Sequence, residues 1–290
     1  MVKWIRVGIT LLLASFFVTA CGFNQSSFED IEAKNMEEKK QASSQPEISK
    51  QQQYASGKSE KEKTKETGPL TSKELSHLKK YEKDDVVFNG KRDSEKWVAL
   101  TFDDGPHPEY TEKILDILQK EKVKATFFLI GQNVKSYPKL VQKELDEGHV
   151  IGNHSWDHPF LPGLGKEAAT ANIEKAKKEI EKAVKKQVTL LRPPYGAVEG
   201  IKKELKKSGS VIVNWDVDTN DWREGRTSEQ IFEAVKKHVQ PGSIILQHDG
   251  GGNRSATIQA LPKIIRYLKE QGYQFATIDQ LLEMRPYIEG

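Results

Sequence analysis

The strongest constraint on the fold is a regular alternation of short apolar runs with amphipathic stretches from residue 97 onward. The apolar runs are 97–102, 125–130, 149–153, 188–191, 210–217, 243–247 and 274–278. The stretches with helical spacing between them are 111–121, 133–147, 166–186, 199–207, 228–238 and 256–271. This alternation predicts an α/β fold with a parallel sheet and helices outside it, either closed into a barrel or left open.

The N-terminus has the pattern of an export signal. Lys3 and Arg6 precede the mostly apolar run "VGITLLLASFFV", which is followed by small residues and Cys21. The run is shorter than the ~20 residues that span a bilayer, so a signal peptide over 1–20 is predicted. Cys21 after small residues resembles the lipobox of bacterial lipoproteins, which implies a lipid on its sulfur and a place on the extracellular face of the cell membrane. An ordinary signal peptide or an uncleaved anchor is the alternative.

The segment after the signal has too few apolar residues to fold alone. Residues 21–70 are rich in Gln, Ser, Lys and Glu and predict a disordered, lipid-anchored tether. Residues 71–96 form an N-terminal extension to a catalytic domain over 97–290, and Asn89-Gly90 predicts a hairpin turn. The net charge of +3 does not indicate nucleic-acid binding, although a weakly basic face suits an anionic polymer. A single cysteine excludes an intrachain disulfide.

Titratable residues follow the predicted strands at the point where each strand ends. In parallel sheets and barrels, functional groups gather at this edge. Five different runs end in such residues, which are Asp103 and Asp104, His154 and His158, Arg192, Asp218 and Asp221, and His248. The clustering predicts one shared site, because scattered surface charge would also decorate strand starts and helix faces.

Two of these groups have the chemistry of a metal site. His154 and His158 are four residues apart, a spacing that places both rings on one side of a helical turn. With an anionic third ligand they suit zinc with an open position for water, and also non-haem iron or cobalt. Asp103 and Asp104 cannot both face inward from a regular strand, and Gly105-Pro106 is expected to break it. One carboxylate then binds the cation and the other stays free, unless one merely caps the turn.

The remaining strand-end residues fit acid–base chemistry. Arg192 is expected to hold the free carboxylate in a bidentate pair. The stiff "RPPYG" segment fixes the direction of the Tyr195 backbone N–H. Asp221 or Asp218 is expected to orient the His248 ring and raise its pKa, which would make His248 an acid.

Taken together, the motifs resemble the polysaccharide deacetylases of carbohydrate esterase family 4, the NodB homology domain. The resemblance covers about residues 96–285 and rests on "TFDDGP", "HSWDH", "RPPY", "DTNDW" and "LQH", which occur in this order. It implies a distorted (β/α) barrel of seven or eight parallel strands.

The resemblance also implies a role for each motif residue. Asp103 would be the general base, oriented by Arg192, and Asp104, His154 and His158 would hold a divalent metal, usually Zn²⁺, with Co²⁺ or another ion as an alternative. The remaining implied roles are an oxyanion donor in the backbone N–H of Tyr195, a general acid in His248 tuned by Asp221, and a pocket for the acetyl methyl lined by Leu246 and Trp222.

These roles predict an enzyme that removes the N-acetyl group of N-acetylglucosamine in peptidoglycan or a chitin-like polymer and releases acetate. N-acetylmuramic acid and acetylxylan are alternative substrates within the same family. Two further alternatives are a surface lipoprotein that only binds glycan on a deacetylase scaffold, and an iron-dependent reaction with oxygen, which "HSWDH" alone permits.

Overall fold

The computed structural model describes residues 82–83, 86–93 and 95–288, which all belong to the compact unit Lys63–Gly290. The predicted signal peptide, the tether and most of the extension over 71–96 therefore lie outside the described residues. Within the described part, no helix combines the length and apolarity needed to cross a bilayer.

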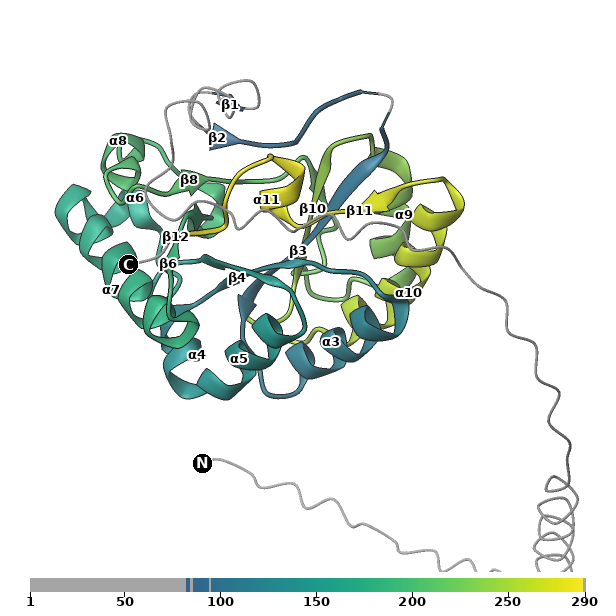
Figure 1. The fold of residues 1–290 in the computed structure, drawn as a ribbon, viewed down its shortest axis with the longest axis horizontal. Coiled ribbons are helices and arrows are strands. Elements are labelled where there is room, and N and C mark those ends of the chain that lie inside the picture. The colour runs from purple at the N-terminus through teal and green to yellow at the C-terminus, as the bar shows by residue number, and fades with distance from the viewer. Residues whose placement is uncertain (1–81, 84–85, 94, 289–290) are drawn as a thin grey trace, which may run out of the picture. The chain divides into compact units, whose positions relative to one another are not determined.

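A parallel sheet of eight strands forms the centre of the described unit (Figure 1). In order across the sheet the strands are β8 (Val211–Ile212), β7 (Leu190–Leu191), β5 (Val150–Asn153), β4 (Thr126–Leu129), β3 (Trp97–Gly105), β10 (Ser243–His248) and β9 (Val217–Asp218), with β11 (Gln274–Phe275) paired to β3. The remaining strands form two small antiparallel pairs, β1 (Glu82–Lys83) with β2 (Val86–Val87) and β6 (Gln187–Val188) with β12 (Tyr287–Ile288).

Helices cover the outside of the sheet (Figure 1). They are α3 (Tyr110–Glu121), α4 (Gly131–Ser136), α5 (Pro138–Asp146), α6 (Leu161–Leu164), α7 (Lys166–Val184), α8 (Lys202–Lys206), α9 (Ser228–His238), α10 (Ser255–Glu270) and α11 (Ile278–Leu281), with a 3-10 turn, η1 (Pro194–Gly196). Their apolar faces pack against the sheet; in α3 the buried residues include Ile114, Leu115 and Leu118. The predicted distorted (β/α) barrel of seven or eight parallel strands is confirmed.

Strand β3 is the central element of the sheet. Its sequence WVALTFDDG is buried from Val98 to Gly105, and it pairs with β10 on one side and β4 on the other. A strand with both faces covered needs a nearly continuous apolar run. The two carboxylates at the end of β3 depart from this pattern. No strand pairing among the described residues joins β8 to β9, so the barrel is open there.

Two local expectations from the sequence are wrong. The run 210–217 is not one strand but two, because β8 pairs with β7 at one end of the sheet and β9 pairs with β10 at the other. Asn214 and Trp215 lie between them, and Val213 instead bridges Val87. Asn89-Gly90 does not turn a hairpin, because Asn89 bridges Ser243 and so ties the extension to the barrel.

Several helix ends carry residues that cap the free backbone groups. Thr227 caps α9 in a capping box with Gln230. Gly148 follows α5 and Gly272 follows α10, both with positive φ (81° and 79°), the conformation that favours glycine after a helix. The stretch 133–147 is divided between α4 and α5, because Pro138 starts a new helix rather than continuing the first.

Candidate active site at the strand ends

The residues at the C-terminal ends of the strands lie around one cavity, as the alternation of strands and helices predicts. A cleft of about 590 Å³ opens where β3, β5, β7, β9 and β10 end. Its lining includes the predicted site residues Asp103, Asp104, His154, His158, Tyr195, Trp222, Leu246 and His248. Residues separated by more than 140 positions in the chain thus share one cavity.

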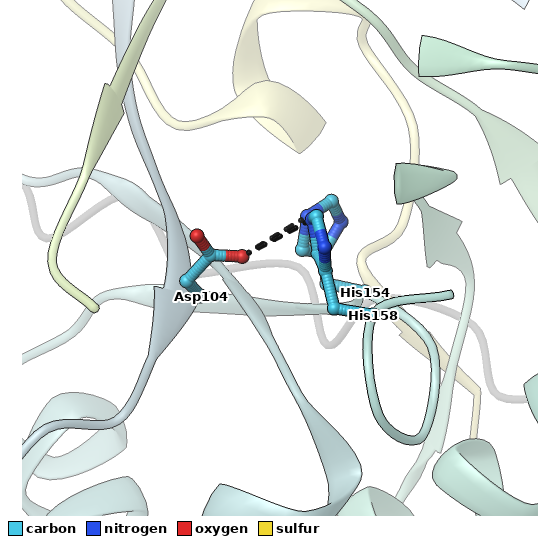
Figure 2. A group of neighbouring side chains, drawn as sticks. All are labelled: Asp104, His154 and His158. Atoms are coloured by element: carbon cyan, nitrogen blue, oxygen red, sulfur yellow. Dashed lines mark ion pairs between the residues drawn. The ribbon is translucent and has the colours of Figure 1, made fainter. Parts of the chain in front are cut away.

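Asp104, His154 and His158 form a compact cluster in this cleft (Figure 2). Asp104 Oδ1 lies 3.5 Å from His154 Nε2 and 3.4 Å from His158 Nε2. One ligand atom from each residue falls within 4.8 Å of the other two. Asp104 Oδ1 is buried and has no hydrogen-bond partner among the described residues. An unpartnered buried carboxylate oxygen facing two imidazoles is the donor set that a divalent cation would satisfy.

Asp103 and Asp104 diverge, although the strand bends earlier than expected. Strand β3 continues through Gly105, and the register with β4 shifts between Asp103 and Gly105. The bend is at Asp104 itself, which has φ of 75°. The expected break at Gly105-Pro106 is therefore corrected to a bulge one residue earlier, and the bulge turns the two carboxylates to different partners.

The loop that carries both histidines is not helical, which corrects the expectation of a helical turn. Ser155 and His158 have positive φ (76° and 57°), and hydrogen bonds replace the helical pattern. The Ser155 N–H donates to Asn153 Oδ1 at 2.9 Å, and the His158 N–H donates to Ser155 Oγ at 3.0 Å. Because such backbone strain persists only where the surroundings enforce it, this loop is held in a shape that brings the rings to 5.0 Å.

His154 is oriented and uncharged. Its Nδ1 lies 2.7 Å from the backbone oxygen of Arg192, an arrangement in which Nδ1 carries the proton and donates it. Nε2 is then the free nitrogen that faces Asp104. Burial lowers the pKa of His154 to about 3, although the nearby Asp104 opposes the shift. A neutral imidazole with a free Nε2 is the form that binds metal.

Arg192 holds Asp103 through one contact only. Arg192 Nη1 donates to Asp103 Oδ1 at 2.7 Å, whereas Nε and Nη2 donate to the backbone oxygens of Val213 and Asn214. The predicted bidentate pair is therefore wrong, because the guanidinium also ties down the segment between β8 and β9. Burial raises the pKa of Asp103 above its ordinary 3.8, with Arg192 opposing it. A carboxylate with a raised pKa is a better base than an exposed one.

His248 is paired with Asp221 and not with Asp218. The His248 Nδ1 and Asp221 Oδ1 atoms are 2.7 Å apart, and Thr257 Oγ1 donates to the other Asp221 oxygen at 2.7 Å. Burial lowers the pKa of His248, but the paired Asp221 carboxylate, with smaller contributions from Asp103 and Asp104, raises this pKa to about 9. Asp218 instead accepts from the Asn220 N–H. His248 therefore carries a proton at neutral pH.

The other predicted residues also border the cleft. Tyr195 has φ of 61° and is exposed, Trp222 is also exposed, and Leu246 is buried; all three line the cleft. His107, which directly follows "TFDDGP", and Asp157, which lies in "HSWDH", have other contacts. His107 Nδ1 accepts from the Glu109 N–H at the start of α3, and Asp157 accepts from Asn172.

Sequence reasoning missed several supporting residues. Asn172 on α7 accepts from the Trp156 N–H at 2.8 Å and donates to Asp157 at 2.7 Å, so it anchors the histidine loop. Arg254 lines the cleft and donates to the Asp221 backbone oxygen. The sequence pattern predicts only that Asn172 lies in a helix and Arg254 in a loop. No feature of the neighbouring sequence indicates their contacts with motifs far away in the chain.

The Asp221–His248 pair predicts a pH effect. If activity needs protonated His248, it falls as pH rises through about 9, the pKa of this group. In Asp221→Asn, burial remains and the main raising carboxylate is gone, with only the smaller effects of Asp103 and Asp104 left, so the alkaline limb should move down by about two pH units. The measurement is kcat/KM against pH, with Asp218→Asn as the matched control. An unchanged alkaline limb in Asp221→Asn would contradict the pairing.

An α/β barrel with an Asp-His-His cluster at its strand ends is an architecture of metal-dependent hydrolases. The family model for polysaccharide deacetylases matches residues 90–212. A peptidoglycan-N-acetylglucosamine deacetylase of Bacillus cereus is 43% identical over 195 residues, which cover 66% of this chain and 91% of that protein. The chain therefore belongs to the polysaccharide deacetylase family, carbohydrate esterase family 4.

Two further comparisons agree with this assignment. The peptidoglycan-N-acetylmuramic acid deacetylase PdaC of Bacillus subtilis is 40% identical over 198 residues, which cover 68% of this chain and 41% of that protein. The chain also resembles a crystal structure of a peptidoglycan N-acetylglucosamine deacetylase in complex with 4-naphthalen-1-yl-N-oxidanyl-benzamide. The TM-score is 0.67 and the sequence identity 38%, and the alignment covers 73% of this chain and 98% of that chain.

Proposed function

We propose that this protein is a metal-dependent N-deacetylase that removes acetyl groups from N-acetylglucosamine in peptidoglycan or a chitin-like polymer. The proposal rests on a cation cluster, a carboxylate and a protonated imidazole that lie together in one cleft. The Asp104, His154 and His158 cluster has the Asp103 carboxylate on one flank, 3.7 Å from His154 Nε2, and the protonated His248 also lines the same cavity. A cation site, a base and an acid are the three parts that amide hydrolysis needs.

Zn²⁺ is the cation that the donor set favours. Two imidazoles and one carboxylate match catalytic zinc sites, which keep a position open, and Co²⁺ has similar preferences. When bound, such an ion supplies Lewis acidity that polarises a carbonyl and makes water more acidic. Asp104, His154 and His158 would hold it. The unpartnered Asp104 Oδ1 and the neutral, oriented His154 support this assignment.

The chain's own residues supply the proton transfers. Asp103, fixed by Arg192, accepts a proton from the water that attacks the acetyl carbonyl. The backbone N–H of Tyr195 is assigned to the developing oxyanion, and Leu246 and Trp222 to the acetyl methyl. An amine anion is a very poor leaving group, so His248 donates its proton to the nitrogen as the carbon–nitrogen bond breaks. Acetate and a free amino sugar result.

The test of this function is acetate release from the full chain with a panel of glycans. The panel holds peptidoglycan, N-acetylglucosamine oligomers and acetylxylan, and mass spectrometry of the products identifies which sugar loses its acetyl group. Release from N-acetylglucosamine that stops with a chelator and returns with Zn²⁺ supports the proposal. Release only from N-acetylmuramic acid or acetylxylan would replace the substrate, and no release from any glycan would overturn the enzymatic reading.

A purely glycan-binding role on the same scaffold has less support. A binding module has no use for a buried base held by an arginine or for an imidazole whose pKa is raised by a carboxylate. The iron and oxygen alternative likewise leaves Asp103 and His248 without a task. The intact acid and base therefore favour hydrolysis.

We also propose that Cys21 carries a lipid that holds the protein on the extracellular face of the membrane. The support is the sequence alone, a charged start and an apolar run that end in small residues before the cysteine. Cys21→Ser is expected to lose incorporation of labelled palmitate in a bacterial host and to leave the membrane fraction. Palmitate labelling that persists in this variant would contradict the proposal.

A further inference from the structure

Two exposed aromatic side chains lie near the cation cluster. Tyr195 belongs to one of the five motifs, and Phe160 belongs to none. Phe160 is 56% exposed and follows His158 by two residues. Its ring centroid lies 6.3 Å from that of Tyr195, which is 64% exposed and contacts the His158 ring at 4.7 Å. Tyr195 thus contacts both His158 of the cation cluster and Phe160, and Phe160 itself is not among the residues that line the cleft.

The outward position of Phe160 is built into the local structure. The next residue, Leu161, is fully buried and anchors α6 in the core, so Phe160 at the helix start faces away from it. The Gly163 N–H donates to the Phe160 backbone oxygen at 3.0 Å. A Cβ on Gly163 would lie 3.3 Å from Phe160 Cδ1, so the ring rests against this glycine. The fold gains little burial from this phenylalanine, which leaves its exposed face open to a ligand.

We propose that Phe160, with Tyr195, forms a stacking subsite for a sugar ring next to the one that is deacetylated. This inference rests on the proposed function and names where a longer glycan is held. The apolar face of a pyranose ring packs on an exposed aromatic ring, and sites of this kind combine aromatic walls with a few polar groups.

A glycan fits this surface better than a protein partner. Specific protein–protein interfaces bury about 1,200–2,000 Å² in total, far more than two aromatic side chains offer. The surface is also continuous with the cleft through Tyr195, so a polymer whose acetyl group enters the cleft must extend over its rim. A second copy of the chain is the competing occupant that the experiment must exclude.

The experiment compares Phe160→Ala with the wild type on tetra-N-acetylchitotetraose and on 4-nitrophenyl acetate, which carries no sugar. The kcat/KM for the tetrasaccharide divided by that for the small ester should fall about three- to tenfold, mainly because KM for the tetrasaccharide rises. Phe160→Trp should restore the ratio. Tyr137→Ala removes an exposed aromatic ring next to α5 that, among the described residues, has no ring contact with Tyr195; it is the matched control and should keep the wild-type ratio.

Three outcomes would overturn the subsite. They are a wild-type ratio with both kcat/KM values unchanged in Phe160→Ala, a wild-type ratio because both values fall equally, and a wild-type dimer that only Phe160→Ala dissociates. If the wild type releases no acetate, the proposed function fails separately, and calorimetric binding of the tetrasaccharide decides. Weaker binding by Phe160→Ala than by Tyr137→Ala then supports the subsite, and equal binding overturns it.

Discussion

Asp104→Asn is expected to lose the bound metal and with it the deacetylase activity. Among the described residues, Asp104 supplies the one carboxylate of the cation cluster, and its Oδ1 lies 3.4–3.5 Å from Nε2 of both histidines. Asparagine keeps the shape but removes the negative charge that offsets a divalent cation. Changing a residue that only supports a metal ligand typically lowers metal affinity about 10–100-fold. Changing Asp104, which would be a direct ligand, should therefore lower metal affinity at least about 100-fold. Metal content after dialysis and acetate release measure the two losses.

The matched control for this variant is Asp157→Asn. Asp157 belongs to the loop that carries both histidines, but its carboxylate accepts from Asn172 at 2.7 Å and takes no part in the cluster. The control should keep most of the metal and activity. An Asp104→Asn protein that retains one metal per chain, or an Asp157→Asn protein that loses metal equally, would refute the assignment of Asp104.

The location of the site was predictable because it depends on topology. Parallel strands place their C-terminal ends on the same edge, so the sequence positions of Asp103, His154, Arg192 and His248 at the ends of apolar runs already imply proximity. Pairing of β10 with β3 in register places His248 directly opposite Asp103, as the structure shows. No detailed side-chain geometry was needed for this inference.

The local geometry was not predictable, because it depends on contacts between distant segments. The bulge at Asp104, the non-helical loop over 154–158 and the division of the run 210–217 are all enforced by partners far away in the chain. Arg192, for example, donates to the backbone of Val213 and Asn214 as well as to Asp103. A residue whose spare donors are taken by backbone atoms cannot form the bidentate pair that its chemistry alone suggests.

Asp103→Asn is expected to keep the metal and lose turnover. The amide cannot accept the proton of the attacking water, and removal of a general base typically costs 10²–10⁴-fold, so kcat should fall about 10³-fold. The change also leaves the buried Arg192 without its counter-charge, which should lower the melting temperature. Arg192 keeps its bonds to Thr101, Val213 and Asn214, so the fold and the cluster are expected to survive.

Metal content, circular dichroism and single-turnover acetate release separate these effects. An Asp103→Asn protein that is folded, contains the wild-type amount of metal and is inactive has lost a base and not a ligand. Asp103 Oδ2 lies 3.7 Å from His154 Nε2, close enough that a second carboxylate in the metal site is the rival explanation. Loss of metal in Asp103→Asn would favour that rival, and turnover within tenfold of the wild type would remove Asp103 from the mechanism.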